Sequence, residues 1–433
     1  MGSSDELTDY SSVQDYLFGL KAKGIKFGID RMRSLAAEIG HPERQLPVIH
    51  LAGTNGKGST AAMLDQILRR AGKKVGLYTS PHLVKLGERV QVEREILTET
   101  EIVEYTRELL PVAELLGASS PDDHPSFFEF MTAMAFLQFA RKGCDVAVAE
   151  VGLGGELDAT NIVQPAVTAI TSIGFDHCEI LGRTHAEIAS AKAGIIKPGI
   201  PVVVGRMPAE AEAVIRARAT EVGAPLTSVR DRFGEALDSY PRTALMGDCQ
   251  RWNAATASLV IEALGWGIGL ELIEQGLAEA HWPARWEQFT VQGRSVIMDA
   301  SHNPEGAAEL SLNLARLFEQ TGKKPIVVVG ALGLPRAKPL IHAVAEFAAE
   351  IHIVVPAQAR ACNHQDIRAL IPASFDGQVH DSDVEQLFGG NGIANWTAVQ
   401  DLIVVTGSIY LAGEVMAYLD PLKGTVDSHL QDF

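Results

Sequence analysis

A lysine and hydroxyl side chains lie in a glycine-rich segment that directly follows an apolar run. The segment extends from Gly53 to Thr60, reads G-T-N-G-K-G-S-T, and follows the run Ile49–Ala52. Backbone N–H groups of such a turn converge on phosphate oxygens, and a lysine can neutralise phosphate charge. The spacing is shorter than the usual G-x-x-x-x-G-K-[ST]. We predict a nucleotide-triphosphate site that includes Asn55, Gly56, Lys57, Gly58 and Ser59.

Two further donor residues follow predicted strands. Glu150 stands at the end of the apolar run 145–149, and His177 follows the run 166–172 after a short turn. Ligands of open parallel sheets bind at the carboxyl ends of the strands. Oxygen ligands with one imidazole suit Mg²⁺ or Mn²⁺ better than Zn²⁺. Beside a phosphate loop, this pair predicts a divalent metal site with Glu150 and His177 as ligands.

Alternating apolar strands and longer helical patterns must position these residues. The alternation predicts an α/β fold with a doubly wound parallel sheet, followed by a smaller Rossmann-like α/β domain. The expected strands are 46–52, 75–79, 145–149, 166–172 and 200–204, then 295–299, 324–330, 350–355 and 401–406. The expected helices include 59–71, 99–116, 127–142 and 184–196. We expect an ATP-binding domain over residues 1–292 and a second domain over 293–433.

Composition excludes several classes of protein. The net charge of −17 argues against nucleic acid as the main partner, and the 46% hydrophobic fraction is normal for a globular chain. No apolar run is long enough to span a bilayer, and the acidic first residues do not form a secretory signal. The cysteines are not paired as CxxC, which argues against a zinc knuckle. We expect a cytoplasmic enzyme with small-molecule substrates.

An ordered set of motifs resembles the folylpolyglutamate synthase/dihydrofolate synthase family of Mur-type amide ligases. The resemblance covers Gly24 to the C-terminal helix. Besides the glycine-rich loop, its motifs are T-S-P-H-L at 79–83, F-F-E-F at 127–130, E-V-G-L-G-G at 150–155, L-D-A-T-N at 157–161, D-H at 176–177, K-A-G-I at 192–195, Gln250 with N-A-A at 253–255, Asp299 with H-N-P at 302–304, and V-T-G-S at 405–408.

The resemblance implies ATP-dependent amide bond formation through an acyl phosphate. It implies that L-glutamate is added to dihydropteroate, to folates, or to both. It further implies that Ser80, Glu150 and His177 ligate magnesium, that Lys57 holds phosphates, and that Asn253, Arg285 and Asp299 reach ATP. Lys57, Lys192, His177 and Glu150 are the implied catalytic residues. The family leans towards monomers.

Lys192 matches the lysine that Mur-type ligases carry as a carbamate formed from CO₂. A carbamate converts this cation into an anion with metal-binding oxygens. The alternative from sequence alone is an exposed lysine on the helix 184–196.

The resemblance also implies a pteridine pocket. Its expected residues are Ile29, Asp30, Arg31, Ser126, Phe127, Phe128, Glu129, Leu157, Asp158 and Ala159, whereas His302 is expected at the interdomain cleft, where glutamate would bind. Aromatic rings supply stacking surface, and carboxylates accept from pterin N–H groups.

Several positions depart from the family pattern. Glu156 replaces a usually basic residue, Cys249 replaces a histidine, Ala300 and Ser301 replace the glycine and alanine of G-A-H-N-P, and Ala284 replaces the glycine of P-G-R. None lies in the phosphate loop or among the expected metal ligands, so the departures bear on the acceptor rather than on ATP. Two alternatives remain open at this point: a ligase for another acceptor, such as a peptidoglycan precursor or amino-acid polymer, and a nucleotide-dependent switch without turnover.

Overall fold

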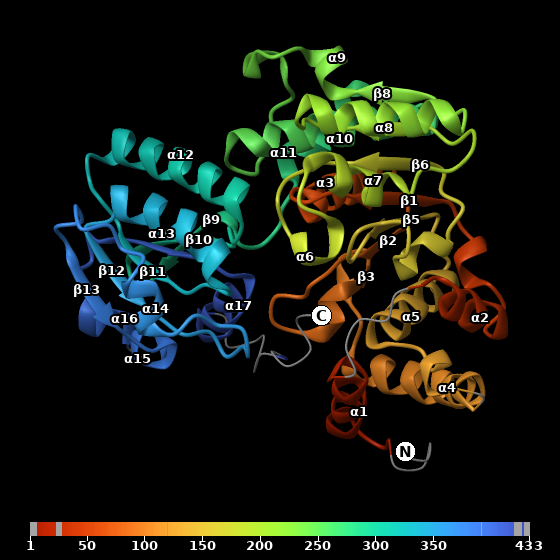
Figure 1. Ribbon diagram of the computed structural model, residues 1–433, viewed down its shortest axis with the longest axis horizontal. Helices are drawn as coiled ribbons and strands as arrows, with labels where there is room; N and C mark the ends of the chain where they lie inside the picture. Colours follow the sequence, from red (N-terminus) through yellow and green to blue (C-terminus); the bar gives the residue numbers. More distant parts are fainter. Residues whose placement is uncertain (1–6, 23–27, 119, 391, 420–426, 428–433) are drawn as a thin grey trace.

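The protein folds into two lobes, each built on one β-sheet (Figure 1). This computed structural model describes residues 7–22, 28–118, 120–390, 392–419 and 427. The acidic first residues and Gly24, which the sequence analysis mentions, lie outside the described residues. We call the lobe of residues 7–284 the N-terminal lobe and that of residues 285–419 the C-terminal lobe.

The N-terminal lobe contains an eight-stranded sheet in the order β4-β3-β2-β5-β1-β6-β7-β8. Its strands are β1 (Val48–Ala52), β2 (Val75–Tyr78), β3 (Val90–Val92), β4 (Glu95–Ile96), β5 (Val146–Glu150), β6 (Val167–Ile170), β7 (Val202–Val204) and β8 (Leu226–Ser228). The strands from β2 to β8 in this order are parallel, and β3 and β4 add antiparallel pairs at one edge. The central strands are fully buried, as expected for a parallel sheet with both faces covered.

Helices cover both faces of this sheet. They are α1 (Tyr10–Ala22), α2 (Asp30–Glu38), α3 (Lys57–Arg70), α4 (Glu99–Gly117), α5 (Phe127–Arg141), α6 (Cys178–Leu181), α7 (His185–Ala193), α8 (Ala209–Glu221), α9 (Val229–Phe233), α10 (Asp248–Leu264) and α11 (Leu270–Glu279). Alternate residues of β1 face opposite cores: Ile49 and Leu51 pack with α3, α10 and α11, whereas Val48 packs in the core that contains α5. Short 3₁₀ turns are η1 (Pro42–Arg44), η2 (Leu86–Arg89), η3 (Pro121–Asp123), η4 (Ala159–Ile162) and η5 (Leu237–Ser239).

The C-terminal lobe contains a six-stranded sheet in the order β13-β12-β11-β14-β10-β9. Its strands are β9 (Arg285–Val291), β10 (Arg294–Asp299), β11 (Ile326–Val329), β12 (Glu350–Ile353), β13 (Gln378–Asp381) and β14 (Leu402–Thr406). Its helices are α12 (Pro304–Thr321), α13 (Leu334–Phe347), α14 (His364–Arg368), α15 (Val384–Phe388), α16 (Gly392–Trp396) and α17 (Ile409–Leu419). α12 and α13 cover one face, and α15 and α17 cover the other.

The expected α/β architecture is confirmed, with corrections at element ends. The helix expected at 184–196 ends at Ala193. Glu150 is the last residue of β5 rather than the residue after it. The second sheet begins with β9, which pairs with β10 in a hairpin. A boundary at 292/293 would divide that hairpin, and we therefore propose a boundary before Arg285.

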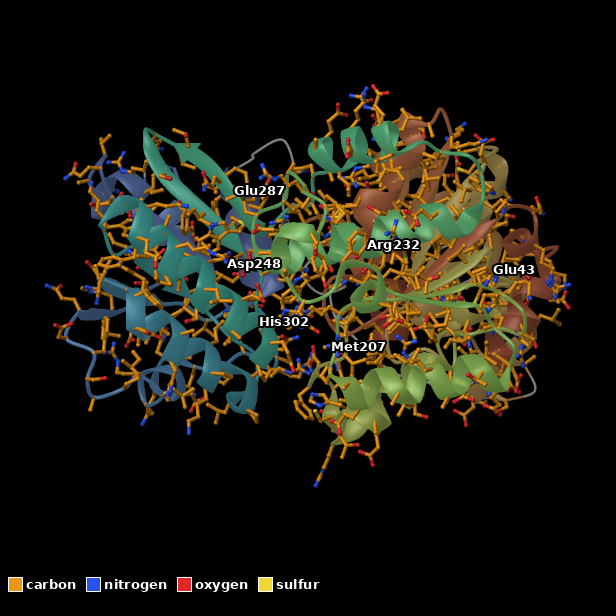
Figure 2. The ribbon with its side chains drawn as sticks, turned by 90° about the horizontal axis from the view of Figure 1, so that it is seen from above. Glu43, Met207, Arg232, Asp248, Glu287 and His302 are labelled. Carbon is orange, nitrogen blue, oxygen red and sulfur yellow. The ribbon has the colours of Figure 1, made fainter. Side chains whose placement is uncertain are left out.

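The junction between the lobes is lined by charged and polar side chains. Figure 2 shows Asp248 and His302 where the two lobes meet. Asp248 of α10 forms an ion pair with Arg316 of α12 at 2.5 Å. No helix within the described ranges is both long and apolar enough to cross a membrane, and the four cysteines are free thiols.

Candidate active site

The glycine-rich segment forms a tight turn between β1 and α3. Gly56 lies in the left-handed region at φ 85°, immediately before the first helical residue, Lys57. A Cβ atom at Gly56 would collide with the side-chain amide of Asn253, and one at Gly58 would lie 2.7 Å from Trp282 Nε1. Glycine is therefore required here by backbone conformation and by close packing against the rest of the cleft.

The Lys57 side chain folds back over this turn. Its ammonium group donates to the carbonyl oxygens of Gly53 at 3.1 Å and Thr54 at 3.3 Å. Glu150 Oε1 lies 3.7 Å away. The ammonium thus stands at the mouth of the loop, next to the buried carboxylate at the end of β5.

Four neighbouring strands bring their carboxyl ends to this point. The strands are adjacent in the order β2, β5, β1 and β6. Ser80 follows β2, Glu150 ends β5, the Gly53 turn follows β1, and His177 follows β6. Burial raises the pKa of Glu150, while Lys57, Arg285 and the Ser80 backbone oppose the shift. Ser80, Glu150 and His177 line one cavity with the phosphate loop. The sheet therefore gathers the predicted metal ligands at one edge.

His177 lies at the same edge of the sheet, and its imidazole is neutral at neutral pH. Burial lowers its pKa to about 4, against the opposing charge of Asp176. A neutral imidazole retains a lone pair for a metal ion at neutral pH. The backbone N–H of His177 donates to Asp176 Oδ1 at 2.9 Å, which orients this turn.

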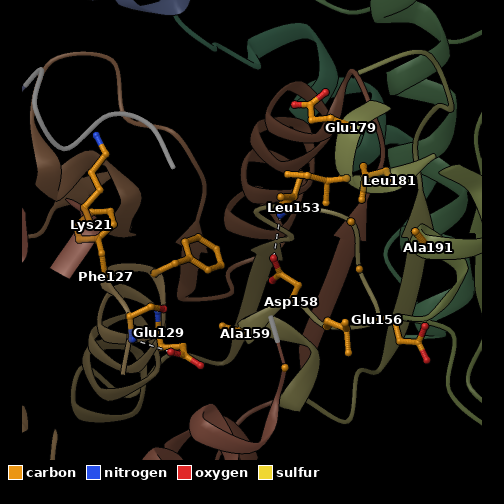
Figure 3. Close-up of a pocket in the computed structure, with 17 residues that line it drawn as sticks. Lys21, Phe127, Glu129, Leu153, Glu156, Asp158, Ala159, Glu179, Leu181 and Ala191 are labelled. Atoms are coloured by element: carbon orange, nitrogen blue, oxygen red, sulfur yellow. Dashed lines mark hydrogen bonds between the residues drawn. The ribbon is translucent and has the colours of Figure 1, made fainter. Parts of the chain in front are cut away.

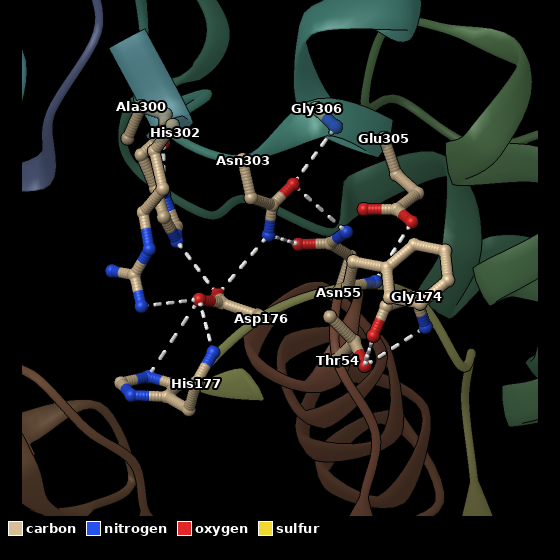
Figure 4. A network of polar contacts seen from close by, with 12 residues as sticks. Thr54, Asn55, Gly174, Asp176, His177, Ala300, His302, Asn303, Glu305 and Gly306 are labelled. Atoms are coloured by element: carbon tan, nitrogen blue, oxygen red, sulfur yellow. Dashed lines mark hydrogen bonds and ion pairs between the residues drawn. The ribbon is translucent and has the colours of Figure 1, made fainter. Parts of the chain in front are cut away.

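Asp176 joins the two lobes (Figure 4). Its carboxylate accepts from Asn303 Nδ2 at 3.2 Å and pairs with Arg336 at 2.7 Å and His302 at 3.6 Å. Burial would raise the pKa of Asp176, but hydrogen bonding to His302 and the charges of His302, His177 and Arg336 hold it well below the ordinary range. Asp176 is therefore an anion that holds groups of the C-terminal lobe above the phosphate loop.

A second connection between the lobes involves the phosphate loop itself. Asn303 Nδ2 donates to Asn55 Oδ1 at 2.9 Å, and Asn55 Nδ2 donates back to Asn303 Oδ1 at 3.2 Å. Asn303 also caps α12 by accepting from the Gly306 N–H at 2.9 Å. The loop and the first turn of α12 are thus aligned by one amide pair.

Lys192 is buried, which excludes the exposed-lysine alternative. It lies near the end of α7 with 5% of its surface exposed, and its Nζ donates to the Gly53 carbonyl at 2.9 Å. Burial and the nearby Lys57 charge lower the pKa of Lys192 to about 7. A substantial share of neutral amine at neutral pH makes this lysine nucleophilic.

The residues expected to reach ATP line the same cavity, which has a volume of about 570 Å³. Asn253 of α10 is held by a bond from its Nδ2 to Gln250 Oε1 at 3.0 Å. Arg285 begins β9. Asp299 ends β10, and its carboxylate accepts from the N–H groups of Trp286 and Ser301. All three lie around the phosphate loop.

A second cavity of about 480 Å³ lies beside the first (Figure 3). The two share Leu153, Gly154 and Leu181 as lining residues. Of the residues expected around the pteridine, those that line this cavity are Ser126, Phe127, Phe128, Glu129, Leu157, Asp158 and Ala159, together with Glu156. The aromatic rings, the carboxylates and the shared wall suit a flat, polar acceptor whose reacting end extends towards the phosphate loop.

Several of these polar groups are already committed to the protein. Ser126 and Glu129 form a capping box at the start of α5, and Arg31 donates to Glu129 at 3.4 Å. Asp158 accepts from the Leu153 N–H at 2.9 Å and from Thr160. These bonds hold the pocket wall and leave only the remaining lone pairs for a ligand.

Three expected residues do not line either cavity. Asp30 is exposed and pairs with Arg33 at 3.0 Å. Arg31 contacts Glu129 but does not itself line the pocket, and Ile29 precedes α2 without lining the pocket. The start of α2 packs beside the pocket. Similarity to the family segment therefore identified residues that support the pocket wall as well as residues that line it. His302 lines the interlobe cavity instead, as expected.

Sequence reasoning missed two cationic residues of the site. Arg336, in the first turn of α13, follows β11, so the carboxyl-end rule applied to the second sheet would have found it. Lys21, in the last turn of α1, lines the second cavity, and burial lowers its pKa to about 8. No sequence pattern marked Lys21, because its position depends on packing of α1.

Comparison with known proteins agrees with this geometry. Residues 51–222 match the Mur ligase middle domain, and residues 284–409 match the Mur ligase glutamate ligase domain. A dihydrofolate synthase/folylpolyglutamate synthase of Bacillus subtilis is 34% identical over 94% of this chain and 98% of its own length.

Solved structures show the same similarity. The Mycobacterium tuberculosis folylpolyglutamate synthase complexed with ADP and AMPPCP has a TM-score of 0.84 at 28% identity, over 96% of this chain and 99% of its own. The bifunctional synthase of Yersinia pestis, complexed with AMPPNP and a Mn ion, has a TM-score of 0.80 at 30% identity, over 96% and 99% of the two chains. The chain therefore belongs to the Mur ligase family, within the group of folylpolyglutamate and dihydrofolate synthases.

Proposed function

We propose that this protein is an ATP-dependent ligase that adds L-glutamate to dihydropteroate, to folates, or to both. The observation that carries the proposal is the junction at Leu153 and Gly154, where the cavity of the phosphate loop meets the acceptor pocket. An acceptor lying in the pocket would present its carboxylate to the γ-phosphate of a nucleotide held by the loop.

The reaction then proceeds in two steps. An acceptor carboxylate oxygen attacks the γ-phosphorus, the bond to the β-phosphate oxygen breaks, and ADP leaves as an acyl phosphate forms. The amine of glutamate next attacks the acyl carbon, phosphate departs, and the amine loses its proton. Phosphoryl transfer of this kind requires positioning and charge neutralisation more than covalent participation by the protein. We propose that Lys57 and the N–H groups of its loop perform that task.

The buried donors beside the loop suit Mg²⁺ or Mn²⁺. Ser80, Glu150 and neutral His177 would hold the ion, which would neutralise phosphate charge. These donors fit such an ion. Among the described residues, the 3.7 Å contact with Lys57 is the only ion pair of the buried Glu150 carboxylate. We propose Asn253, Arg285 and Asp299 as the remaining nucleotide contacts.

We propose that Lys192 carries a carbamate. An ammonium group at this position would repel a metal ion, whereas a carbamate would supply an anionic oxygen. Its lowered pKa supports the proposal, because CO₂ reacts with the neutral amine.

We propose that His302, which faces the Asp176 cluster across the lobe junction, contacts glutamate.

The negative net charge supports the absence of a nucleic-acid partner. We further propose a cytoplasmic monomer; size-exclusion chromatography with light scattering would check the monomer.

The activity is tested by incubating the protein with Mg-ATP and glutamate, separately with dihydropteroate and with tetrahydrofolate. Mass spectrometry should detect an added glutamate on at least one acceptor, with one phosphate released per bond. Phosphate release without an amide product, or no reaction with either acceptor, would contradict the proposal. Glu150→Gln and His177→Ala should each shift the Mg²⁺ titration of activity to higher concentration, whereas Glu221→Gln, on the exposed side of α8, should not.

A further inference from the structure

One carboxylate and two imidazoles meet on β12 and β13, outside the active site. Glu350 and His352 belong to β12, and the parallel register places His352 directly opposite His380 of β13. Residues two apart on a strand face the same side, so the three side chains project from one face of the sheet. In Figure 1 these strands lie at the edge of the second sheet that is remote from the N-terminal lobe.

The three side chains approach one another closely enough to share an ion. Their potential ligand atoms all lie within 4.8 Å of one another. Glu350 Oε1 is 2.9 Å from His352 Nε2 and 3.0 Å from His380 Nε2. Tetrahedral coordination with bonds of about 2.0–2.2 Å separates ligand atoms by roughly 3.4 Å. Binding of an ion would therefore require the partly exposed Glu350 and His380 side chains to adjust around the buried His352 ring.

The outer contacts of the cluster orient His352 as a ligand. His352 Nδ1 lies 2.8 Å from Ser382 Oγ. When Nδ1–H donates to this hydroxyl, the Nε2 lone pair faces Glu350 and His380. Metal-binding histidines commonly have such an outer hydrogen bond, which sets the tautomer and the ring orientation. Trp396 packs against the His352 ring at 4.6 Å, and its indole N–H donates to the Leu387 carbonyl.

His380 supplies an independent sign of a missing partner. Its Nε2 atom is buried and makes no hydrogen bond to any described residue, although Glu350 Oε1 lies 3.0 Å away. The rest of the His380 side chain is 42% exposed, and that of Glu350 is 30% exposed. His380 Nε2 is thus buried without a hydrogen-bond partner among the described residues. The partly exposed Glu350 and His380 side chains leave the cluster accessible to water and ions.

We propose that Glu350, His352 and His380 bind one divalent cation of the Zn²⁺ class, with water in the remaining coordination position. Two imidazoles and one carboxylate suit a borderline ion such as Zn²⁺, whereas Mg²⁺ and Ca²⁺ prefer oxygen ligands. The site is separate from the Ser80, Glu150 and His177 edge, and it does not depend on the proposed ligase activity. A bound ion would join the edge strand β13 to β12.

The proposal is tested by titrating Zn²⁺ into the full chain, free of nucleotide and Mg²⁺, by calorimetry. Wild type should bind one Zn²⁺ that His380→Ala and Glu350→Gln lose or bind at least tenfold more weakly. Ser382→Ala should weaken binding about 10–100-fold, as for other outer hydrogen bonds of metal ligands. His342→Ala, an exposed histidine on α13, is the matched control and should bind as wild type does. His177→Ala should also retain this ion, which separates it from any ion at the active site.

Direct observation of the ion does not depend on the folding of a variant. Crystals of wild type grown with Zn²⁺ should show an anomalous peak about 2.0–2.2 Å from the three ligand atoms. Equal Zn²⁺ affinity in wild type and His380→Ala would overturn the proposal, as would the absence of any anomalous peak at the cluster. The three side chains would then be only two neighbouring histidines beside a carboxylate, of which His352 is hydrogen-bonded to Glu350.

Discussion

Lys57 and Lys192 both donate to the carbonyl oxygen of Gly53, yet their surroundings differ. Lys57 stands at the cavity mouth beside Glu150, whereas Lys192 is enclosed and has a pKa lowered to about 7. Two ammonium groups at one carbonyl repel each other. A phosphate near Lys57 and a carbamate on Lys192 would each remove that repulsion, so the two lysines have distinct expected phenotypes.

Lys57→Ala should reduce ligase turnover by about 10²–10³, because loss of a charge contact made in the transition state typically costs about 3–4 kcal/mol. The fold should be intact, since the side chain contacts loop carbonyls rather than a core. Turnover and circular dichroism check both points. Lys73→Ala, just beyond α3, is the control and should retain activity. A well-folded Lys57→Ala protein with normal turnover would refute the phosphate-loop assignment.

Lys192→Ala should be nearly inactive and should recover part of its turnover when small carboxylates such as acetate are added. The added carboxylate would occupy the space of the proposed carbamate. Lys57→Ala is the matched control, because acetate cannot replace a cation and should not restore its turnover. An electron-density map with an unmodified Lys192 at saturating bicarbonate and metal would contradict the prediction.

Glu156→Arg should change the preference for acceptor length. Glu156 is exposed and lines the acceptor pocket next to Leu157 and Asp158. A charge reversal within about 4–6 Å of an anionic acceptor changes binding by one to a few kcal/mol at an effective dielectric near 20. Wild type should disfavour long polyglutamate tails relative to dihydropteroate or monoglutamate, and Glu156→Arg should relax this preference. The measurement is kcat/KM for short and long acceptors.

Glu221→Arg, a charge reversal on the exposed side of α8, is the control for net charge. Identical length preference in wild type, Glu156→Arg and Glu221→Arg would assign Glu156 to a solvated loop without a role in specificity.

At the scale of the elements, the start of α5 forms part of the wall of the second cavity, which we propose as the acceptor pocket. Ser126 and Glu129 satisfy each other's backbone N–H groups in a capping box, directly before the aromatic pair Phe127 and Phe128. A similar box joins Thr98 and Glu101 at the start of α4. The two boxes have the same local chemistry, but only that of α5 lines the acceptor pocket.

Ser126→Ala should lower the free energy of unfolding by about 1 kcal/mol, the usual cost of a lost N-cap, and should raise KM for the acceptor. Urea unfolding and steady-state kinetics measure the two effects. Thr98→Ala should lose similar stability with an unchanged acceptor KM. If both variants change KM equally, the effect is one of general stability, and the proposed coupling is wrong.

At the scale of the whole molecule, we expect catalysis to require that the two lobes stay aligned. Asp176 of the N-terminal lobe accepts from Asn303 and pairs with Arg336, both of the C-terminal lobe. Each group is mostly buried, so the contact is desolvated and sensitive to the loss of one partner. The same carboxylate neighbours His177, and lobe alignment is thus linked to the metal edge.

Arg336→Ala should reduce ligase turnover about 10–10²-fold while changing nucleotide affinity by less than about threefold. Truncation of one partner of a buried charge pair typically costs at least about 2 kcal/mol, here spent on lobe alignment. Turnover and nucleotide titration measure the two quantities, and small-angle scattering with bound nucleotide should detect a wider arrangement of the lobes.

Arg368→Ala is the matched control, because Arg368 pairs with Asp381 at the surface of the C-terminal lobe. A loss of nucleotide affinity in Arg336→Ala as large as the loss of turnover would instead make Arg336 a nucleotide contact.

The sequence by itself determined the alternation of strands and helices, the phosphate loop and the edge at which ligands gather. Short apolar runs that alternate with helical patterns, such as 146–149, predict buried strands, and a parallel sheet brings their carboxyl ends to one edge. Glu150, His177 and the Gly53 turn were predictable for this reason, since each lies within a few residues of its strand.

Only the tertiary structure decided which side chains meet across long separations. From the sequence, Lys192 was either the lysine that carries a carbamate or an exposed helical lysine. Packing of α7 against the Gly53 turn buries it. Lys21 reaches its cavity through the packing of α1, which no local pattern encodes, whereas Arg336 follows β11 at a strand end but meets Asp176 only because the two lobes dock. The facing of Glu350 and His352 with His380 depends on the register of β12 with β13, because a shift of one residue would turn His380 to the other face.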